Sequence, residues 1–313
     1  MKILVTGGCG YVGSVLTNHL LKENHKVTVI DTQWFGNYLK KHPNLINKKI
    51  DIRNFPEKIL KNVDVVFHLA NIANDPSVEL NPELAWEVNC LGTQKLIEKC
   101  IKNKVKKFIF ASSGSVYGIK KEKHVTEDLD LVPISTYNKT KMVAERILLS
   151  YSNYIENFII RPATVCGISP RMRFDVSVNM LTLHALKKKK ITVFGGNQIR
   201  PNIHIDDLIN LYKFIINNKN FKAGIYNAGF ENISILDIAK KINKKIKSDI
   251  IILPSNDPRS YRQNSDKLLK TGFKQKYNVE LAIEQIIQEY NRNPNIENLK
   301  SYTVKWMKKI KAK

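Results

Sequence analysis

The most constraining feature of this 313-residue chain is a glycine-rich turn near its start. A short apolar run, Ile3–Val5, precedes glycines at every third position from residue 7 to 13, and apolar residues then recur with helical spacing. In such a strand–turn–helix unit, glycines allow a tight turn, close approach of the backbone to a pyrophosphate and close helix packing. The N–H groups at the helix start also attract phosphate, so the turn predicts dinucleotide binding. The residues expected to contact the cofactor here are Gly7, Gly10, Tyr11, Val12 and Gly13.

The residue at the end of the second apolar run indicates which dinucleotide is bound. Asp31 follows Val27–Ile30, 18 residues after Gly13. A carboxylate at this point accepts hydrogen bonds from the adenosine ribose hydroxyls and repels a 2′-phosphate. Thr32 and Gln33, which follow, are neutral and offer no cation to such a phosphate. The sequence therefore predicts NAD rather than NADP.

Strand-like and helix-like segments alternate through the first half of the chain. Further buried strands are predicted at Val63–Phe67, Phe108–Phe110 and Phe158–Ile160. This alternation predicts an α/β fold built on a Rossmann-type, doubly wound parallel sheet. We expect an NAD-binding domain over residues 1–166, to which some later segments return, and a smaller C-terminal α/β substrate lobe over residues 167–313.

The second half has a looser pattern of elements. We predict helices at about Asp175–Leu186, Asp206–Ile216 and Ile233–Ile246, and a strand at Ile191–Phe194. Ser234, with Asp237 three residues later, is expected to cap the last of these helices.

The net charge of +23 is the one unusual bulk property. Summed positive charge attracts nucleic acids and membrane surfaces. Only nine of the 51 basic residues are Arg, however, and the lysines are scattered along the chain. Lysine runs such as 187–190 lack the interleaved aromatic side chains of a stacking platform for bases. We therefore expect a solvated, lysine-rich surface, with nucleic-acid binding as the alternative.

Other bulk features are typical of a cytoplasmic protein. No apolar run approaches the roughly 20 residues that cross a bilayer. The first strand begins directly after Met1, where a signal peptide would otherwise lie. The four cysteines and seven histidines show no spacing of a disulfide framework or a metal site. We expect a cytoplasmic protein with no membrane span and no metal.

A tyrosine and a lysine four residues apart predict general-base chemistry. Tyr137 and Lys141 lie on the same face of a predicted helix. A free phenol has a pKa of about 10, which a nearby ammonium and a positive nicotinamide ring should lower. Ser113 follows a predicted strand at the sheet edge where ligands bind. We expect Ser113 to orient the substrate oxygen, Tyr137 to remove its proton as hydride passes to NAD, and Lys141 also to hold the nicotinamide ribose.

Each of these residues also has an ordinary structural interpretation. A lone pair of this kind is usually a half-buried ring beside a lysine that reaches the solvent, and a lone serine usually belongs to a loop. The combination, in this order behind a dinucleotide turn, favours catalysis.

Longer segments carry a resemblance to a known family. They are Asp51-Ile52, His68–Asn71, Asn89–Thr93, Ala111–Gly118, Tyr137–Lys141 and Arg161–Thr164, with Arg200–Asp207 and Asp257–Tyr261 in the second half. Together with the glycine spacing, the chain resembles the extended short-chain dehydrogenase/reductases, and in particular the nucleotide-sugar epimerases and dehydrogenases of the NAD-dependent epimerase/dehydratase family. The similarity weakens only after about Glu289.

The resemblance implies further contact residues. For NAD they are Asp51, Ile52, Leu69, Ala70, Asn71, Asn89 and Pro162. For a nucleotide-diphosphate sugar they are Ser113, Ser115, Asn179, Phe194, Arg200 and Arg259. The two arginines are expected to bind the diphosphate, because guanidinium groups match phosphate oxygens.

Other residues of these segments have a less definite role. Cys166 is a departure from the family pattern, since it replaces the tyrosine of a Val-Tyr-Gly turn. Arg171 and Arg173 could hold phosphates, but they could equally be solvated loop cations. His68 and His204 are expected to be structural residues without a partner.

Residues that are absent narrow the reaction within the resembled family. The related 4,6-dehydratases carry Asp-Glu where this chain has Gly114-Ser115, and the sugar-acid decarboxylases carry Glu at the position of Ser115. Both reactions are therefore disfavoured, which leaves oxidation of one carbinol, at C4 of the sugar. A ketone that turns over and takes hydride on its other face makes the enzyme a 4-epimerase. A ketone that leaves makes it a 4-dehydrogenase, or a 4-keto reductase in reverse.

Three further expectations rest on the same resemblance. Residues 169–175 resemble a subgroup that includes heptose 4-dehydrogenases, so the dehydrogenase alternative stays open. A non-catalytic NAD-sensing regulator is a remote alternative, because such proteins lack the Tyr137/Lys141 pair. Helices near Asn89–Cys100 and Lys139–Ser150 are expected to form a four-helix interface in a homodimer.

Overall fold

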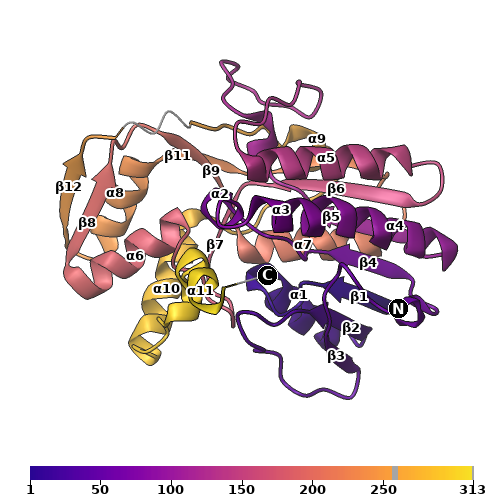
Figure 1. Ribbon diagram of the computed structural model, residues 1–313. Helices are drawn as coiled ribbons and strands as arrows, with labels where there is room; N and C mark the ends of the chain where they lie inside the picture. The colour runs from indigo at the N-terminus through magenta and orange to yellow at the C-terminus, as the bar shows by residue number, and fades with distance from the viewer. Residues whose placement is uncertain (256–259, 312–313) are drawn as a thin grey trace.

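A seven-stranded sheet forms the centre of the computed structural model, which describes residues 1–255 and 260–311. Its strands lie in the order β10-β6-β5-β4-β1-β2-β3, and every neighbouring pair is parallel (Figure 1). Their bounds are β1 Lys2–Thr6, β2 Lys26–Asp31, β3 Leu45–Lys49, β4 Val65–His68, β5 Lys107–Ala111, β6 Glu156–Pro162 and β10 Gly224–Ala228. The predicted Rossmann-type sheet is confirmed, and its strand order reverses between β1 and β4.

Helices cover both faces of this sheet. They include α1 (Tyr11–Lys22), α4 (Gly92–Lys102), α5 (Thr136–Ser150) and α7 (Ile205–Asn217). Side chains of a strand alternate between faces, so Ile3 and Val5 of β1 pack in one apolar cluster and Leu4 in another. The first cluster contains residues of α1 and α7, and the second contains residues of α4 and α5. The continuous apolar runs that predicted buried strands therefore reflect burial on both sides.

Smaller sheets and three helices make up most of the second lobe. A three-stranded sheet contains β11 (Glu231–Ser234), β9 (Ile199–His204) and β7 (Thr164–Cys166), and β12 (Asp249–Leu253) pairs with β8 (Lys190–Phe194). One apolar cluster joins β8 to α6 (Ser177–Lys188), α8 (Ile235–Lys245) and α10 (Val279–Arg292). β10 joins the central sheet although it lies beyond residue 167.

Short elements complete the described part of the chain. They are η1 Glu57–Leu60, α2 Asp75–Val78, α3 Pro82–Trp86, η2 Glu87–Leu91, η3 Gly114–Tyr117, α9 Asp266–Leu269, η4 Leu299–Ser301 and α11 Thr303–Ile310. Among the helices in the described ranges, none combines the length and apolar character needed to span a bilayer.

The predicted helix boundaries in the second half are nearly those observed. Ser234 accepts a hydrogen bond from the backbone N–H of Asp237 at 3.0 Å, which confirms it as the cap of α8. The helix predicted from Asp175 begins at Ser177 instead. The Asp175 carboxylate accepts hydrogen bonds from Arg173 and from the backbone of Thr303, which keeps this residue in the preceding loop.

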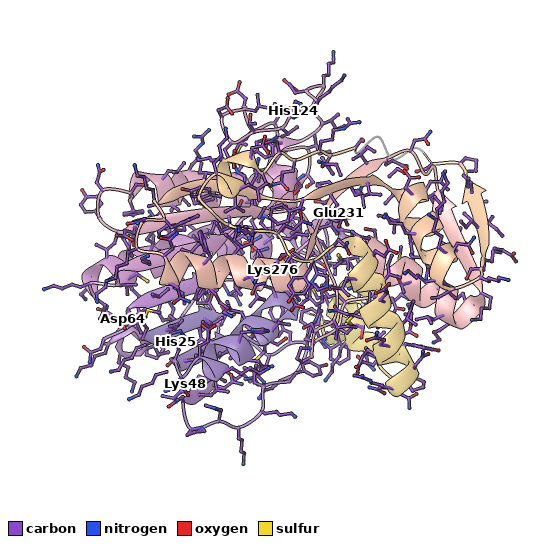
Figure 2. The ribbon with its side chains drawn as sticks, turned by 180° about the vertical axis from the view of Figure 1, so that it is seen from behind. His25, Lys48, Asp64, His124, Glu231 and Lys276 are labelled. Carbon is purple, nitrogen blue, oxygen red and sulfur yellow. The ribbon has the colours of Figure 1, made fainter. Side chains whose placement is uncertain are left out.

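The two ends of the central sheet differ in their surroundings. His25 and Asp64 directly precede β2 and β4, and they lie at the end of the sheet away from the second lobe (Figure 2). Glu231 lies at the opposite side, where the two lobes meet (Figure 2). The carboxyl ends of the strands therefore face the second lobe, which is where parallel sheets bind ligands.

Candidate active site

A cavity of about 490 Å³ lies between the carboxyl ends of the central strands and the second lobe. The predicted site residues that line it are Gly7, Gly10, Tyr11, Val12, Gly13, Leu69, Asn71, Ser113, Ser115, Tyr137, Lys141, Pro162 and Arg200. They come from the turn after β1, the loop after β4, the end of β5, α5, β6 and β9. The fold thus brings most of the predicted cofactor and catalytic residues to one place.

The glycine turn presents an uncapped helix end to this cavity. Gly7 has φ +72°, and a Cβ there would lie 2.6 Å from the backbone nitrogen of Ala70, so only glycine fits. A Cβ on Gly13 would overlap the carbonyl oxygen of Gly7. Gly10 is the N-cap residue of α1, and no side chain caps that helix. The first turn of α1 therefore offers its N–H groups to a ligand in the cavity.

Asp31 is held rigidly at the end of β2. Its two oxygens accept hydrogen bonds from the backbone N–H groups of Cys9, at 2.9 Å, and Gln33, at 2.6 Å. Burial raises the pKa of Asp31, and these two hydrogen bonds and the charge of Arg171 oppose that rise. Each carboxylate oxygen has a second lone pair, so the side chain can still accept from ribose hydroxyls.

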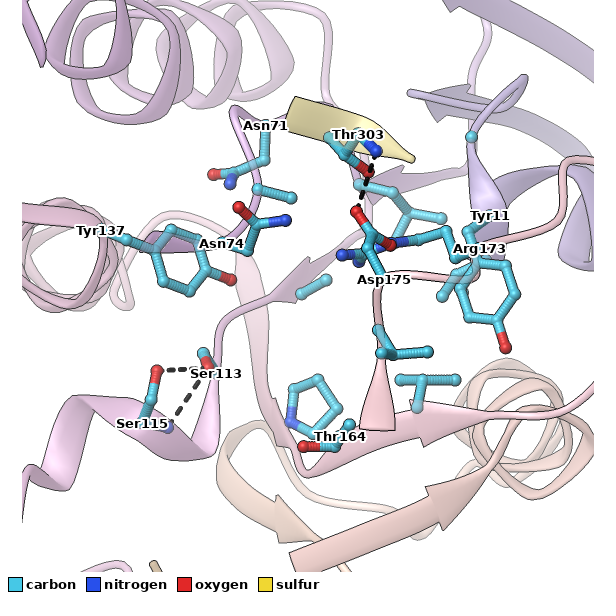
Figure 3. A pocket seen from close by; sticks show the side chains of 18 of the residues that line it. Tyr11, Asn71, Asn74, Ser113, Ser115, Tyr137, Thr164, Arg173, Asp175 and Thr303 are labelled. Atoms are coloured by element: carbon cyan, nitrogen blue, oxygen red, sulfur yellow. Dashed lines mark hydrogen bonds and ion pairs between the residues drawn. The ribbon is translucent and has the colours of Figure 1, made fainter. Parts of the chain in front are cut away.

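Ser113 is positioned by a small network of hydroxyl groups. Its Oγ lies 2.7 Å from Ser115 Oγ and accepts a hydrogen bond from the Ser115 backbone N–H at 3.2 Å (Figure 3). Ser115 Oγ in turn donates to Asn138 Oδ1 at 2.5 Å. Ser113 and Tyr137 both line the cavity (Figure 3). Ser113 therefore points at the same space as the Tyr137 hydroxyl.

Tyr137 and Lys141 lie one turn apart on α5, as predicted. Ser135 caps this helix by accepting a hydrogen bond from the Asn138 backbone N–H at 3.2 Å. Lys141 Nζ donates to the Ala111 carbonyl at 2.6 Å and lies 4.6 Å from the centre of the Phe110 ring. Burial lowers the pKa of Lys141 to about 7.

Lys141 was expected to lower the pKa of Tyr137. Among the protein's own groups it is not one that does so. Burial, with a contribution from the charge of Asp75, raises the pKa of Tyr137 to about 12. The Ser113 hydroxyl and the charge of Arg173 oppose this rise in pKa, so among the protein's own groups Arg173 is the cation that favours the phenolate. Lys141 is directed at the Ala111 carbonyl instead.

Several cavity residues were not found from the sequence. Trp34, Phe35, Asn74, Asp75, Asp175 and Thr303 all line the cavity, although they come from four separate segments. Arg173 and Asp175 face Tyr137 across it, and Arg173 Nε donates to Asp175 at 2.8 Å (Figure 3). Asp75 accepts a hydrogen bond from Ser135 at 2.5 Å. The Asn-Asp pair after the β4 loop was a visible polar signal, but only the fold shows that it faces the catalytic groups.

Of the two alternatives for Arg171 and Arg173, the one that makes them solvated loop cations is wrong. Arg171 is 4% exposed, and Arg173 is ion-paired with Asp175 in the cavity wall. His68 and His204 are structural, as predicted, but both have partners. The His68 ring bonds to Thr6 and Thr93, whereas the His204 ring bonds to Gln285 and to the first turn of α7.

Asn89 is buried behind the cavity and does not line it. It lies in η2, a π-helical turn between α3 and α4. Its side-chain amide accepts from the Ile72 backbone N–H at 2.9 Å and donates to Thr140 at 3.0 Å. These bonds fix the loop that presents Asn71 to the cavity.

The other predicted contact residues lie outside the cavity wall. Ala70 follows Leu69 in the β4 loop, and its N–H donates to Thr6; Ile52 is buried. Asp51 pairs with Arg53 at 2.9 Å. Asn179 is fully buried and bonds to Tyr11 and the Gly167 turn, whereas Phe194 is 59% exposed at the end of β8. Arg259 lies outside the described residues.

Comparison with known proteins identifies the family. Residues 3–229 match the NAD dependent epimerase/dehydratase family. The chain belongs to this family. This match confirms the predicted family, and with it an NAD-dependent enzyme.

Individual members of the family are similar over most of the chain. A Bacillus subtilis protein described as an uncharacterized UDP-glucose epimerase, YtcB, is 34% identical over 265 residues, covering 77% of this chain and 81% of that protein. The UDP-glucose 4-epimerase of Lactobacillus helveticus is 30% identical over 273 residues, covering 77% and 82%. The UDP-glucuronic acid 4-epimerase of Bacillus cereus, solved with UDP-glucuronic acid and NAD, has a TM-score of 0.81 at 30% identity and covers 93% of this chain and 100% of that one.

The cofactor of the family fits the residues of this cavity. The uncapped start of α1 and the glycine turn line the cavity and suit a dinucleotide's phosphates. Asp31 lies at the end of β2, outside the cavity lining, and suits the adenosine ribose. Tyr137, Lys141 and Ser113 line the same cavity. The site thus has a cofactor end and a reaction end.

Proposed function

We propose that this protein oxidises a carbinol, at C4, of a nucleotide-diphosphate sugar, and that it acts as a 4-epimerase through a transient 4-keto sugar. The observation that supports this most is that Ser113, Tyr137 and Lys141 line one cavity together with the glycine turn. Its relatives include enzymes described as acting on or binding UDP-sugars, so UDP-hexoses are the first substrates to test.

In the first step, oxidation of the sugar carbinol, each of three residues has a separate role. NAD, when bound, supplies the hydride acceptor and a positively charged nicotinamide ring. Ser113 orients the sugar hydroxyl, and Tyr137 accepts its proton as the C–H bond breaks. For this Tyr137 must be a phenolate, the form that the charge of Arg173 and a bound nicotinamide ring would favour. Lys141, whose pKa is lowered to about 7 by burial, can pass protons at neutral pH and can hold the nicotinamide ribose. Returning the proton from Tyr137 completes the second step when hydride reaches the other face of the ketone.

The charged groups in the cavity favour oxidation of the sugar followed by return of the hydride, rather than loss of water. Gly114 and Ser115 provide no acid or base next to Ser113. Two carboxylates do line the cavity, but Asp175 is paired with Arg173 and Asp75 accepts a hydrogen bond from Ser135. We therefore assign these carboxylates to shaping the pocket.

Arg200 is the residue we propose for the substrate diphosphate. It lines the cavity from β9, and its guanidinium lies 5.5 Å from the centre of the Tyr261 ring. This places a cation at the second-lobe side, away from the glycine turn. Asn179, buried beneath the Gly167 turn, would act on the substrate only through the position of neighbouring residues.

The test is to incubate the purified protein with UDP-, GDP- and dTDP-hexoses and analyse the sugars by NMR and mass spectrometry. An epimerase gives the C4 epimer at unchanged mass without net NADH, whereas a dehydrogenase gives a ketone with stoichiometric NADH. Deuterium at C4 should be retained in the epimerised product, since hydride returns inside the site. A product that has lost water would contradict the proposal, as would exchange of the C4 deuterium with solvent.

A further inference from the structure

Arg171 is a buried cation in the cavity wall that the proposed chemistry does not use. The residue is 4% exposed, and its Nε has no hydrogen-bond partner among the described residues. Its guanidinium lies 4.0 Å from the centre of the Phe35 ring, and Nη2 donates to Thr303 Oγ1 at 3.3 Å. A buried charge with an unsatisfied N–H is costly unless an anion completes its contacts.

The segment that carries Arg171 is fixed to the start of α1. Ser169 Oγ donates to the Tyr11 carbonyl at 2.6 Å and lies 3.0 Å from Ser14 Oγ. Arg171 follows two residues later and lines the same cavity as the glycine turn. Two positive features, a guanidinium and an uncapped helix start, therefore lie on one cavity and favour the same anion.

The C-terminal helix closes the outside of this region. Trp306 Nε1 in α11 donates to the Trp34 carbonyl at 2.5 Å, although the two residues are 272 positions apart. Met307 is 4% exposed and packs in an apolar cluster of the first lobe. The Thr303 backbone N–H donates to Asp175 at 2.9 Å. The loop at Trp34 and Phe35 is thus held against the end of the chain.

We propose that Arg171 binds the diphosphate of NAD opposite the start of α1, and that α11 with the Trp34–Phe35 loop forms a clasp that retains the cofactor between turnovers. The clasp rests on the NAD dependence of the family rather than on the proposed sugar reaction.

Calorimetry with a series of cofactor fragments tests the role of Arg171. Arg171→Met should weaken binding of NAD and ADP-ribose by about tenfold or more, since charge-assisted hydrogen bonds are lost, and leave adenosine binding within about twofold. Arg292→Met, which removes an exposed arginine at the end of α10, is the matched control and should change neither. UDP binding should also be unchanged in Arg171→Met. Equal loss of NAD and adenosine, or loss of UDP instead of NAD, would overturn the assignment.

Two more variants keep the test decisive. If Arg171→Met does not fold, Arg171→Lys keeps the charge but not the planar fork, and it should still bind NAD more weakly than the wild type with adenosine binding unchanged. Trp306→Phe keeps an aromatic ring but removes the N–H donor together with the five-membered ring of the indole. Stopped-flow measurement should show NAD leaving this variant at least about threefold faster, because one hydrogen bond of the clasp is lost. An unchanged dissociation rate would overturn the clasp.

Discussion

The ammonium group of Lys141 donates a 2.6 Å hydrogen bond to the carbonyl oxygen of Ala111, at the end of β5. This contact ties α5 to the central sheet at the point where Ser113 enters the cavity. Lys141 is only 3% exposed, and this one hydrogen bond uses only part of the donor capacity of its ammonium group. The cost of burying this charge has a direct consequence for stability.

The stability of the protein should rise with pH through the range in which Lys141 loses its proton. Burial lowers the pKa of Lys141 from 10.5 to about 7. Between these values the unfolded chain binds the proton and the folded chain does not, so unfolding becomes less favourable as pH rises. As pH falls through about 7, this contribution is lost. Urea unfolding of the wild type and Lys141→Met can be measured at pH 6 and pH 9. The free energy of unfolding of the variant, relative to that of the wild type, should be higher at pH 6 than at pH 9. A difference that does not change with pH would contradict the buried charge.

Glu145→Gln should destabilise the fold strongly. Glu145 and Arg161 form an ion pair at 2.6 Å, and their side chains are 1% and 2% exposed. Removing one partner leaves the other charge buried, which typically costs about 3–5 kcal/mol in the free energy of unfolding. Glu156→Gln is the control, because Glu156 pairs with Lys107 at 3.9 Å while 59% exposed. Chemical denaturation showing equal effects of the two changes would mean that the buried pair contributes little.

Asp31→Ala should narrow the preference for NAD over NADP. The change removes the carboxylate that repels a 2′-phosphate and accepts from the ribose hydroxyls. Calorimetry should show that the wild type binds NAD much more tightly than NADP, and that the difference between the two affinities is smaller in the variant. Equal affinity of the wild type for the two cofactors would show that Asp31 does not select between them.

We predict a homodimer formed through α4 and α5. The prediction rests on the family resemblance, and Leu91, which is 52% exposed beside α4, offers apolar surface for it. Two chains of 36.0 kDa give 72.0 kDa, which light scattering at micromolar concentration should report. A single species of 36.0 kDa would contradict this interface.

Local patterns in the sequence were enough to predict the glycine turn between β1 and α1 and the position of Tyr137 and Lys141 one turn apart on a helix. The three glycines, Asp31 and the spacing of Tyr137 and Lys141 depend on one turn or one helix each, so short-range rules apply to them. β3 was not predicted, because Lys48 and Lys49 lie on an exposed edge strand without a clear apolar period.

The missed site residues depend on long-range packing. Arg171 looks like a loop cation in sequence, and only the docking of Ser169 on α1 shows that it is buried beside the cofactor turn. Thr303 reaches the cavity because α11 packs back on the first lobe, 128 positions from its partner Asp175. Burial raises the pKa of Tyr137 before any cofactor is bound, and this burial cannot be read from the Tyr-x-x-x-Lys spacing.

Tyr137→Phe tests the central claim most directly. The change removes one oxygen, so the ring should still pack and NAD should bind with near-normal affinity. General-base catalysis is typically worth about 10²–10⁴-fold, so epimer exchange on the true nucleotide sugar should fall by at least about 10²-fold. Lys141→Met should lose rate and also weaken NAD binding, because that residue has both roles. A Tyr137→Phe enzyme that kept most of its epimer exchange would contradict the proposed mechanism, even with the fold and cofactor unchanged.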